Sequence, residues 1–423
     1  MTHNHHIPLS SFYILERKGP SRPKVGDLSG SIRAALGGLG VEAGKLQGKQ
    51  IALTVGSRGI AHLQEIVRVV CGWLKERGAQ PFVIPAMGSH GGATVEGQLQ
   101  ILDEYGITES EIGAEIRASM ESVVVGKTPQ GFNVCADRHA WESDGIVVMN
   151  RIKPHSDYFG KVESGLLKMM AIGLGKREGA SEGHRQFWKY GFEPTIRAVS
   201  AKILASGKIL FGLGVTENEE NEIADVRAAL PAGFPALDES TLLLARTMLP
   251  RIPFQNLHLL ILDEIGKNIS GAGMDLKVVG RCPGMPPEDA PAYSMIFLRD
   301  LTEQSGGNAI GLGLADVIHE RLFRKIDFQK TYLNAIVALS TEVARLPIHL
   351  PSDRAALDLT LGHVGSPEPA TQRIAWIRNT LNINRIAVSS SIKDQMDSPA
   401  QWKLAEGPFP VEFDAEGDLR SPL

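Results

Sequence analysis

The alternation of apolar runs and amphipathic stretches decides the fold at residues 51–94, which read IALTVGSRGIAHLQEIVRVVCGWLKERGAQPFVIPAMGSHGGAT. The β-branched run at 51–55 predicts a short strand, and the amphipathic stretch at 61–78 predicts a helix. A second apolar run at 81–85 predicts the next strand, and Thr94 is a suitable cap for a helix that continues to about Tyr105. Strands that alternate with helices predict a mostly parallel sheet covered on both faces.

The same alternation continues beyond this stretch. Further strands are predicted at 122–126, 145–150 and 208–218, and helical patterns at 160–175, 178–190 and 194–205. The prolines of MLPRIPFQ (248–255) break the preceding helix and predict a domain boundary. After it come helical patterns at 308–321, 327–339 and 371–381 and a strand at 385–391. We therefore predict two α/β domains with mostly parallel sheets, residues 1–250 and 251–423, with the active site in the cleft between them.

Composition excludes several classes of protein. Of the 423 residues, 43% are hydrophobic and 22% are charged, which is the balance of a globular protein with a large core. A net charge of −4 gives no electrostatic case for binding nucleic acid or an anionic membrane. The three cysteines are too far apart for a zinc motif and fit a reducing cytoplasm, and there is no transmembrane run. We expect a cytoplasmic protein that acts on a small molecule; a homo-oligomer is compatible with this composition.

Three candidate residues, Arg58, His90 and His155, each follow a predicted strand. Because ligands bind beyond the carboxyl ends of parallel strands, we expect the three to converge on one sheet edge. The SHGG context of His90 lets a ligand approach closely, and an imidazole there can transfer protons; a plain surface loop is the alternative. Arg58, in VGSRG, is suited to holding a carboxylate or a phosphate.

Residues 151–185 contain the other candidates and read RIKPHSDYFGKVESGLLKMMAIGLGKREGASEGHR. Arg151 and Lys153 precede the Pro-His pair and are suited to receiving a carboxylate or phosphate, unless the loop is simply solvated. Lys168 lies in an apolar run, where a buried amine must be paired, deprotonated or covalently used, unless its long side chain reaches the surface. His184 lies in a polar helix, where one imidazole binds a metal only if other donors complete the shell.

Lys267 lies in a glycine-rich polar loop of the second unit, DEIGKNISGAGMDLKVVGR (263–281). Its position after an apolar strand predicts a substrate contact across the interdomain cleft, although the loop could also bind nothing. The sequence has no HExxH or CxxC motif and no carboxylate cluster with ligand spacing. Any metal at His184 would therefore need donors from an organic cofactor.

Taken together, these elements resemble the nickel-dependent lactate racemase family, a group of 2-hydroxyacid racemases and epimerases. The family carries a histidine in a glycine-containing loop after a strand, and His90 matches it. It also carries a Pro-His pair and then Ser-Gly-x-x-Lys, with a metal-binding histidine at the spacing that separates Lys168 from His184. The matching residues are Pro154, His155, Ser164, Gly165, Lys168 and His184.

The resemblance implies a cofactor, the nickel-pincer nucleotide, which is a Ni(II) complex of pyridinium-3,5-bisthiocarboxylic acid mononucleotide. Lys168 would hold it covalently through a thioamide, and His184 would be a nickel ligand in a square-planar site. The cofactor would also be bound by Arg58, Ser164 and Gly165, and the substrate by Arg58, Arg151, Lys153 and Lys267. Proteins that synthesise the cofactor are the implied partners.

The implied reaction is reversible hydride transfer from a 2-hydroxy acid to the cofactor. His90 and His155 would be the two acid/bases, since the two enantiomers present their hydroxyl groups from opposite sides. The chain differs from lactate racemases in three places: Val55 replaces an aspartate, the spacing from His155 to Lys168 is longer, and the histidine loop reads SHGG. With the additional cations, these differences favour malate, a short aliphatic hydroxy acid or a sugar acid over lactate.

Two other functions stay open on the sequence. One is a nicotinamide-dependent α/β oxidoreductase, against which the missing GxGxxG in the first strand–helix turn counts. The other is a non-catalytic homologue that has kept the scaffold and lost the cofactor.

Overall fold

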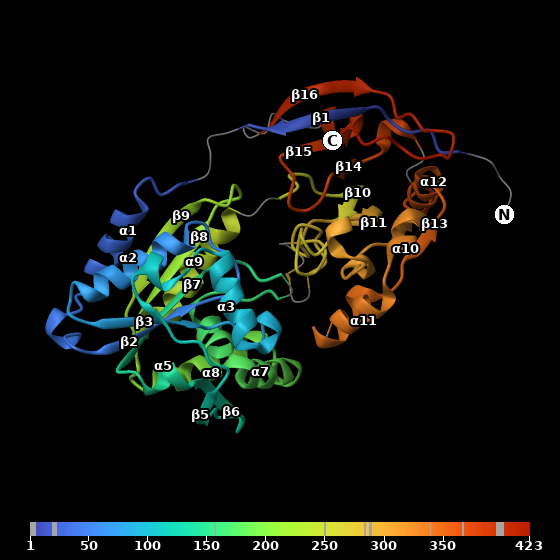
Figure 1. Cartoon of the computed structure of the whole chain (residues 1–423). Coiled ribbons are helices and arrows are strands. Elements are labelled where there is room, and N and C mark those ends of the chain that lie inside the picture. The colour runs from blue at the N-terminus through green and yellow to red at the C-terminus, as the bar shows by residue number, and fades with distance from the viewer. Residues whose placement is uncertain are drawn as a thin grey trace. The chain divides into compact units, whose positions relative to one another are not determined.

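The computed structural model describes residues 6–18, 23–156, 158–248, 251–282, 285–286, 290–338, 340–365, 368–394 and 402–423. These residues form two compact units (Figure 1). The N-terminal unit consists of residues 23–155 and 159–248, and the C-terminal unit contains the remaining described residues. Each is an α/β unit built on a mixed, mostly parallel sheet, as predicted.

The N-terminal unit has a six-stranded sheet with the order β4-β3-β2-β7-β8-β9. Its neighbouring strands are parallel, except for β8 and β9, which are antiparallel. The strands of this sheet are β2 (Gln50–Val55), β3 (Gln80–Pro85), β4 (Glu115–Ile116), β7 (Gly145–Arg151), β8 (Ile209–Glu217) and β9 (Ile223–Ala229). The predicted strand at 122–126 does not join this sheet: β5 (Ser122–Lys127) pairs with β6 (Asn133–Asp137) in a separate antiparallel ribbon.

Helices cover both faces of this sheet, because its central strands are apolar on both sides. Leu53, Val147 and Phe211 pack against one layer of helices, and the alternating position Gly212 lies against Phe234 and Leu166 of other helices. The helices of the unit are α1 (Leu28–Gly37), α2 (Leu63–Lys75), α3 (Val95–Glu104), α4 (Glu109–Ile112), α5 (Arg138–Glu142), α6 (Leu166–Lys168), α7 (Lys176–Tyr190), α8 (Phe192–Leu204) and α9 (Phe234–Thr247).

The C-terminal unit has an eight-stranded sheet with the order β13-β12-β11-β10-β14-β15-β1-β16. Pairing is parallel from β13 to β14 and antiparallel from β14 to β16. Its strands are β1 (Phe12–Arg17), β10 (Leu257–Ile265), β11 (Tyr293–Leu301), β12 (Val317–His319), β13 (Ile348–Leu350), β14 (Ile374–Ile377), β15 (Arg385–Ser389) and β16 (Trp402–Phe409). Its helices are α10 (Glu320–Lys325), α11 (Phe328–Val337), α12 (Asp353–His363) and α13 (Ser390–Asp394).

The first strand of the chain belongs to the C-terminal unit. β1 is antiparallel to both β15 and β16 and lies between them, which Figure 1 shows as a blue strand among red ones. The predicted boundary placed residues 1–250 in one domain, but residues 6–18 form these hydrogen bonds and cluster with the second unit. No helix among the described residues is long and apolar enough to cross a membrane.

Candidate active site

Three parallel strands bring the loops of Arg58, His90 and His155 to one edge of the N-terminal sheet. β2, β3 and β7 end shortly before these three residues in the chain. The order β3-β2-β7 makes the strands direct neighbours, and both pairings are parallel. The loops after them therefore leave the sheet at the same edge, where ligands bind in folds of this class.

The ring of His90 is held by the loop that follows β2. The hydroxyl of Ser57 is hydrogen-bonded to Nδ1 of His90, and Tyr105 OH donates to the Ser57 carbonyl at 3.0 Å. The backbone N–H of His90 donates to the Met87 carbonyl at 3.1 Å. Because Nδ1 is engaged by Ser57, Nε2 is the ring nitrogen that remains for a reacting group.

Desolvation and nearby positive charge favour the neutral forms of His90 and His184. Desolvation, followed by the charges of Arg58, Lys168 and His184, lowers the pKa of His90 to about 4. The residue is exposed at the surface, so the loops desolvate its ring only in part. Desolvation and then the charge of Lys168 also lower the pKa of His184. A neutral imidazole is the form that accepts a proton or binds a metal.

Lys168 ends a one-turn helix and leads into a turn of π-helix. α6 is followed directly by η3 (Met169–Gly173), and π-helical turns occur frequently at functional sites. The carbonyl of Gly173 accepts the N–H of Gly88 at 3.2 Å. The turn after Lys168 is therefore hydrogen-bonded to the loop that carries His90. The helix predicted over 160–175 is thus confined to this short segment, since the residues before it form no helix.

A buried carboxylate fixes the start of α6. Asp238 of α9 accepts the backbone N–H groups of Leu166 and Leu167, each at 2.9 Å. A Cβ at position 165 would lie 2.5 Å from the Asp238 carboxylate, so glycine is needed for this approach. Burial raises the pKa of Asp238 to about 6, although the two backbone donors act in the opposite direction. The absence of a side chain at Gly165 is thus explained by Asp238, and its predicted contact with the cofactor stays a prediction.

The loop of His155 is joined to the entry of α6. The N–H of Lys153 donates to the Ser164 carbonyl at 3.0 Å, and the N–H of Ser164 donates back at 3.2 Å. The carboxylate of Glu163, which is 1% exposed, accepts the backbone N–H of His155 and the guanidinium of Arg246, the latter at 2.6 Å. Glu163 therefore fixes the loop on which His155 lies.

Two phenylalanines connect Lys168, His155 and His184. The ring centroid of Phe192 lies 5.2 Å from that of His155 and 5.8 Å from Nζ of Lys168. Phe187 lies 4.9 Å from Phe192 and 5.5 Å from His184, again between ring centroids. Both phenylalanines are buried, whereas His184 is exposed and Lys168 is half-buried. The side chains of Lys168, His155 and His184 thus lie around one apolar surface, which is formed by the rings of Phe187 and Phe192.

The other predicted substrate residues are engaged elsewhere or lie in the second unit. Arg151 is ion-paired with Glu217, which is 7% exposed, so its charge is already balanced. Lys267 belongs to the C-terminal unit, where its Nζ donates to the Gly271 carbonyl at 2.6 Å and its N–H donates to Ser305 Oγ at 3.0 Å. The interdomain cleft and the role of Lys267 in it stay predictions.

Four residues that build this site were not predicted from the sequence: Ser57, Glu163, Phe192 and Asp238. Each acts on a partner from a different segment of the chain. Ser57 and Glu163 are adjacent to predicted site residues, so their polar side chains next to a motif were a usable signal. Nothing in the sequence around Asp238 distinguishes it from any other helical aspartate.

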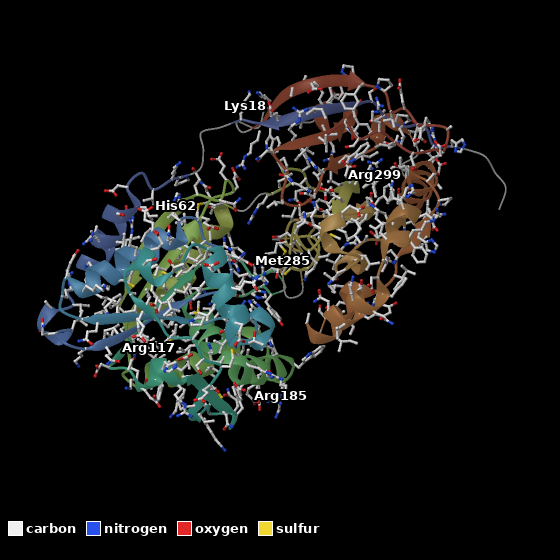
Figure 2. All side chains as sticks on the ribbon, in the orientation of Figure 1. Lys18, His62, Arg117, Arg185, Met285 and Arg299 are labelled. Carbon is white, nitrogen blue, oxygen red and sulfur yellow. The ribbon has the colours of Figure 1, made fainter. Side chains whose placement is uncertain are left out.

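Among the described residues, one group has donor atoms close enough to hold a metal: His319, Asp353 and Asp418, within 4.8 Å of one another. It lies in the C-terminal unit, and Asp353 already accepts from Arg299 at 2.7 Å and from Arg321 at 3.1 Å. Arg299 is labelled in Figure 2 among the side chains of that unit. The carboxylate is therefore neutralised by guanidinium groups. The predicted histidines do not belong to this group.

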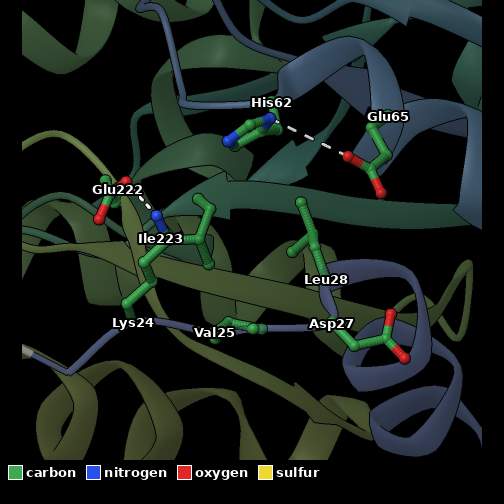
Figure 3. Close-up of a pocket in the computed structure, with 9 residues that line it drawn as sticks. Lys24, Val25, Asp27, Leu28, His62, Glu65, Glu222 and Ile223 are labelled. Atoms are coloured by element: carbon green, nitrogen blue, oxygen red, sulfur yellow. Dashed lines mark hydrogen bonds and ion pairs between the residues drawn. The ribbon is translucent and has the colours of Figure 1, made fainter.

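A surface hollow of about 440 Å³ lies elsewhere on the N-terminal unit, at the start of α1, α2 and β9 (Figure 3). Its charged groups are largely paired. Lys24 contacts Glu222, and His62 lies 4.0 Å from Glu65, which also accepts from the hydroxyl of Ser29. None of the predicted site residues lines this hollow. We therefore assign it no ligand.

Comparison with known proteins finds a similar solved structure and a matching protein family. Among solved structures, the chain is similar to the lactate racemase apoprotein from Thermoanaerobacterium thermosaccharolyticum, with 13% identity, 86% of this chain and 84% of that chain covered, and a TM-score of 0.49. No curated protein sequence matches the chain. Residues 50–191 match the family described as the lactate racemase N-terminal domain, and this range contains His90, His155, Lys168 and His184. The likeness to the lactate racemase family thus lies in this segment of the N-terminal unit.

Proposed function

We propose that the chain is a 2-hydroxyacid racemase or epimerase that uses a nickel-pincer nucleotide. The observation that carries this proposal is the grouping of Lys168, His155 and His184 around Phe187 and Phe192, with His90 in electrostatic reach of Lys168 and His184. When bound, the cofactor supplies a reversible hydride acceptor. The protein must then hold the cofactor, orient the substrate and move one proton.

The residues at this edge fit such a cofactor. His184 is exposed and outside the donor group that could hold a metal, so a metal on it would need donors from another molecule, as the pincer provides. Lys168 is half-buried, and its Nζ lies 5.8 Å from the ring centroid of Phe192, the ring that also contacts His155; as a primary amine it could form the covalent bond to the cofactor. The neutral form of His184 that its surroundings favour is the form that ligates a metal.

His90 and His155 would transfer the substrate's proton. Because its pKa lies at about 4, His90 is neutral at pH 7, and its Nε2 can take the hydroxyl proton while Ser57 holds Nδ1. His155 would act on the opposite enantiomer, with its backbone fixed by Glu163 and its ring against Phe192. The resulting 2-keto acid is planar and can be reduced again on either face.

Arg58 would bind the substrate's carboxylate or the cofactor's phosphate. It is exposed in the loop after β2 and its charge acts on His90, which supports a role for its guanidinium in binding an anion near the proposed base. Arg151 contributes less to anion binding than the sequence indicated, since Glu217 already pairs with it. A second carboxylate on the substrate would then depend on Lys153 and Lys267.

Intact-mass spectrometry combined with nickel analysis tests this function. The chain would be produced in cells that make the cofactor, with a lactate racemase produced in the same cells as a control. We expect a mass increment on Lys168 and bound nickel in the wild type, no increment in Lys168→Ala, and the increment with less nickel in His184→Ala. An unmodified wild-type chain beside a modified control would contradict the proposal and favour a non-catalytic homologue.

Racemisation assays on lactate, malate and gluconate would then identify the substrate. We expect activity on malate or gluconate, because Lys153, which is exposed in the loop of His155, adds a cation beyond Arg58. Activity on lactate alone would reject this substrate class while leaving the racemase proposal intact.

A further inference from the structure

We propose that Gln98 is a positioning residue for the loop of His90, and that the buried ammonium group of Lys176 holds Gln98 in place. Both side chains are fully buried in the N-terminal unit. The inference deepens the proposed function, because it concerns how one of the two proposed bases is held.

The side chain of Gln98 reaches from α3 to the histidine loop. Its Nε2 donates to the carbonyls of Gly88 and His90, each at 3.2 Å. These two carbonyls lie on either side of the turn that leads to the imidazole. An amide that binds both fixes the backbone of His90 without touching its ring.

Lys176 determines which way the amide of Gln98 points. Its Nζ donates to Gln98 Oε1 at 3.0 Å and to the Pro85 carbonyl at 2.9 Å, and it lies 3.4 Å from the carboxylate of Asp137. An ammonium group can only donate, so it must face the oxygen of the amide. The nitrogen of Gln98 is thereby directed at the two loop carbonyls.

The backbone of Lys176 supports a specific role for its side chain. Lys176 is the first residue of α7 and has a φ of 53°, in the left-handed region that non-glycine residues rarely occupy. Strain of this kind persists where the surrounding structure demands it, often near functional sites. Here the strained residue is Lys176, whose ammonium group is buried at the end of β3. Lys176 lies two helical turns before His184 in α7.

A role in stability alone does not explain this arrangement. Asp137 Oδ2 has no hydrogen-bond partner among the described residues, so Lys176 is the charge that balances it. Buried ion pairs contribute little to stability compared with apolar residues of the same volume. What an apolar group cannot do is orient an amide. We therefore assign the ammonium group to orienting Gln98, and through it the loop of His90.

The test is hydrogen exchange on the full chain without cofactor, followed at the backbone amides of residues 88–93. Gln98→Met keeps the side-chain volume but removes both the amide donor and the acceptor. The matched control is Gln372→Met, since Gln372 is also fully buried and donates to a backbone carbonyl, that of Pro8, at 2.7 Å in the C-terminal unit. We expect exchange at 88–93 to become about tenfold faster in Gln98→Met and to stay unchanged in Gln372→Met.

A second variant tests the effect of the Lys176 ammonium group on the loop of His90. Lys176→Met alone would leave Asp137 as an unpaired buried charge, so it is combined with Asp137→Asn, which keeps an acceptor for the N–H of Ala140. We expect faster exchange at 88–93 here as well. Adding Gln98→Met should have little further effect, because Gln98 acts only when Lys176 orients it. Unchanged exchange at 88–93 in either variant, or additive effects, would overturn the proposal.

The cofactor-loaded enzyme supplies a separate readout. If the chain is a racemase, Gln98→Met should lower kcat about tenfold or more with little change in KM, and the mass increment on Lys168 should remain. A change in KM alone would contradict a positioning role. Hydrogen exchange does not depend on enzyme activity. It therefore tests whether Gln98 holds the loop even if the chain is not a racemase.

Discussion

At the scale of single residues, the pKa of His90 is lowered first by desolvation and then by nearby basic groups. Arg58, Lys168 and His184 all disfavour its protonated form. A base with a low pKa is a weak base but stays available over a wide range of pH. If His90 is the base proposed above, we expect it to remain able to accept a proton well below neutral pH.

Removing Arg58 should make His90 more basic. In Arg58→Ala the pKa of His90 should rise from about 4 toward the ordinary value of 6.5, because one repulsive charge is lost. The measurement is a titration of the ring nitrogens by NMR. Arg68→Ala is the control, since Arg68 is exposed on α2 of the same unit and is not among the charges that act on His90. A wild-type midpoint near 6.5 would show that these charges do not act as described.

Asp238 should make the stability of the fold depend on pH. Its folded pKa of about 6 lies above the ordinary 3.8, so the folded protein binds this proton more tightly than the unfolded chain. The resulting stabilisation is fully present below pH 3.8 and is lost as the pH rises to about 6. Relative to Asp238→Asn, the wild type should therefore lose about 3 kcal/mol across that interval.

Urea unfolding of both proteins between pH 4 and pH 7 measures this difference. Asp103→Asn, at an exposed position of the same unit, is the matched control and should follow the wild type. A difference between wild type and Asp238→Asn that does not vary with pH would mean that Asp238 titrates alike in both states.

At the scale of elements, the π-helical turn after Lys168 has no free space at Gly173. An added Cβ would lie 2.5 Å from the backbone oxygen of Ala86 and 2.5 Å from the sulfur of Met169. Gly173→Ala should therefore destabilise the unit by about 1–3 kcal/mol and loosen the hydrogen bond to Gly88. Thermal unfolding and hydrogen exchange at Gly88 are the measurements.

Gly37→Ala provides the control for that substitution. Gly37 lies in α1 with no atom within 4 Å of its added Cβ, so alanine there should stabilise the helix by about 0.5–1 kcal/mol. Equal destabilisation by the two substitutions would contradict a steric role for Gly173.

The sequence predicted elements well where one local pattern dominates. β2, α2 and β3 lie within a residue or three of the predicted 51–55, 61–78 and 81–85, and Thr94 caps α3 by accepting from Gly97 at 3.0 Å. The helices predicted at 308–321 and 371–381 were wrong, because those segments contain β12 and β14. Short buried strands and helical segments have the same apolar pattern, and only pairing with β11 and β10 decides between them.

The candidate site was predictable where a side chain stands out in its own segment. His90 and His155 follow strands, and Lys168 interrupts an apolar run, so local sequence identified them. Phe192 and Gln98 could not be identified in this way. Their importance comes from contacts with residues far away in the chain, and a phenylalanine or glutamine on a helix is ordinary by itself.

At the scale of the whole molecule, the C-terminal unit is completed by the start of the chain. A fragment of residues 251–423 would lack β1, which is the one strand that pairs with β16 among the described residues. We expect limited proteolysis to cleave residues 402–409 rapidly in this fragment, and a peptide of residues 6–18 to restore protection. Equal protection with and without the peptide would show that β16 is held by other contacts. A scrambled peptide of the same composition is the control.

The position of β1 also has a consequence for synthesis on the ribosome. Residues 12–17 are made before the N-terminal unit, yet the strands that flank them, 385–389 and 402–409, are made after it. All of the unit that carries the histidines is translated in between. The leading segment must therefore wait without its partners while that unit folds. Residues 12–17 can therefore enter their sheet only after residues 385–409 have left the ribosome.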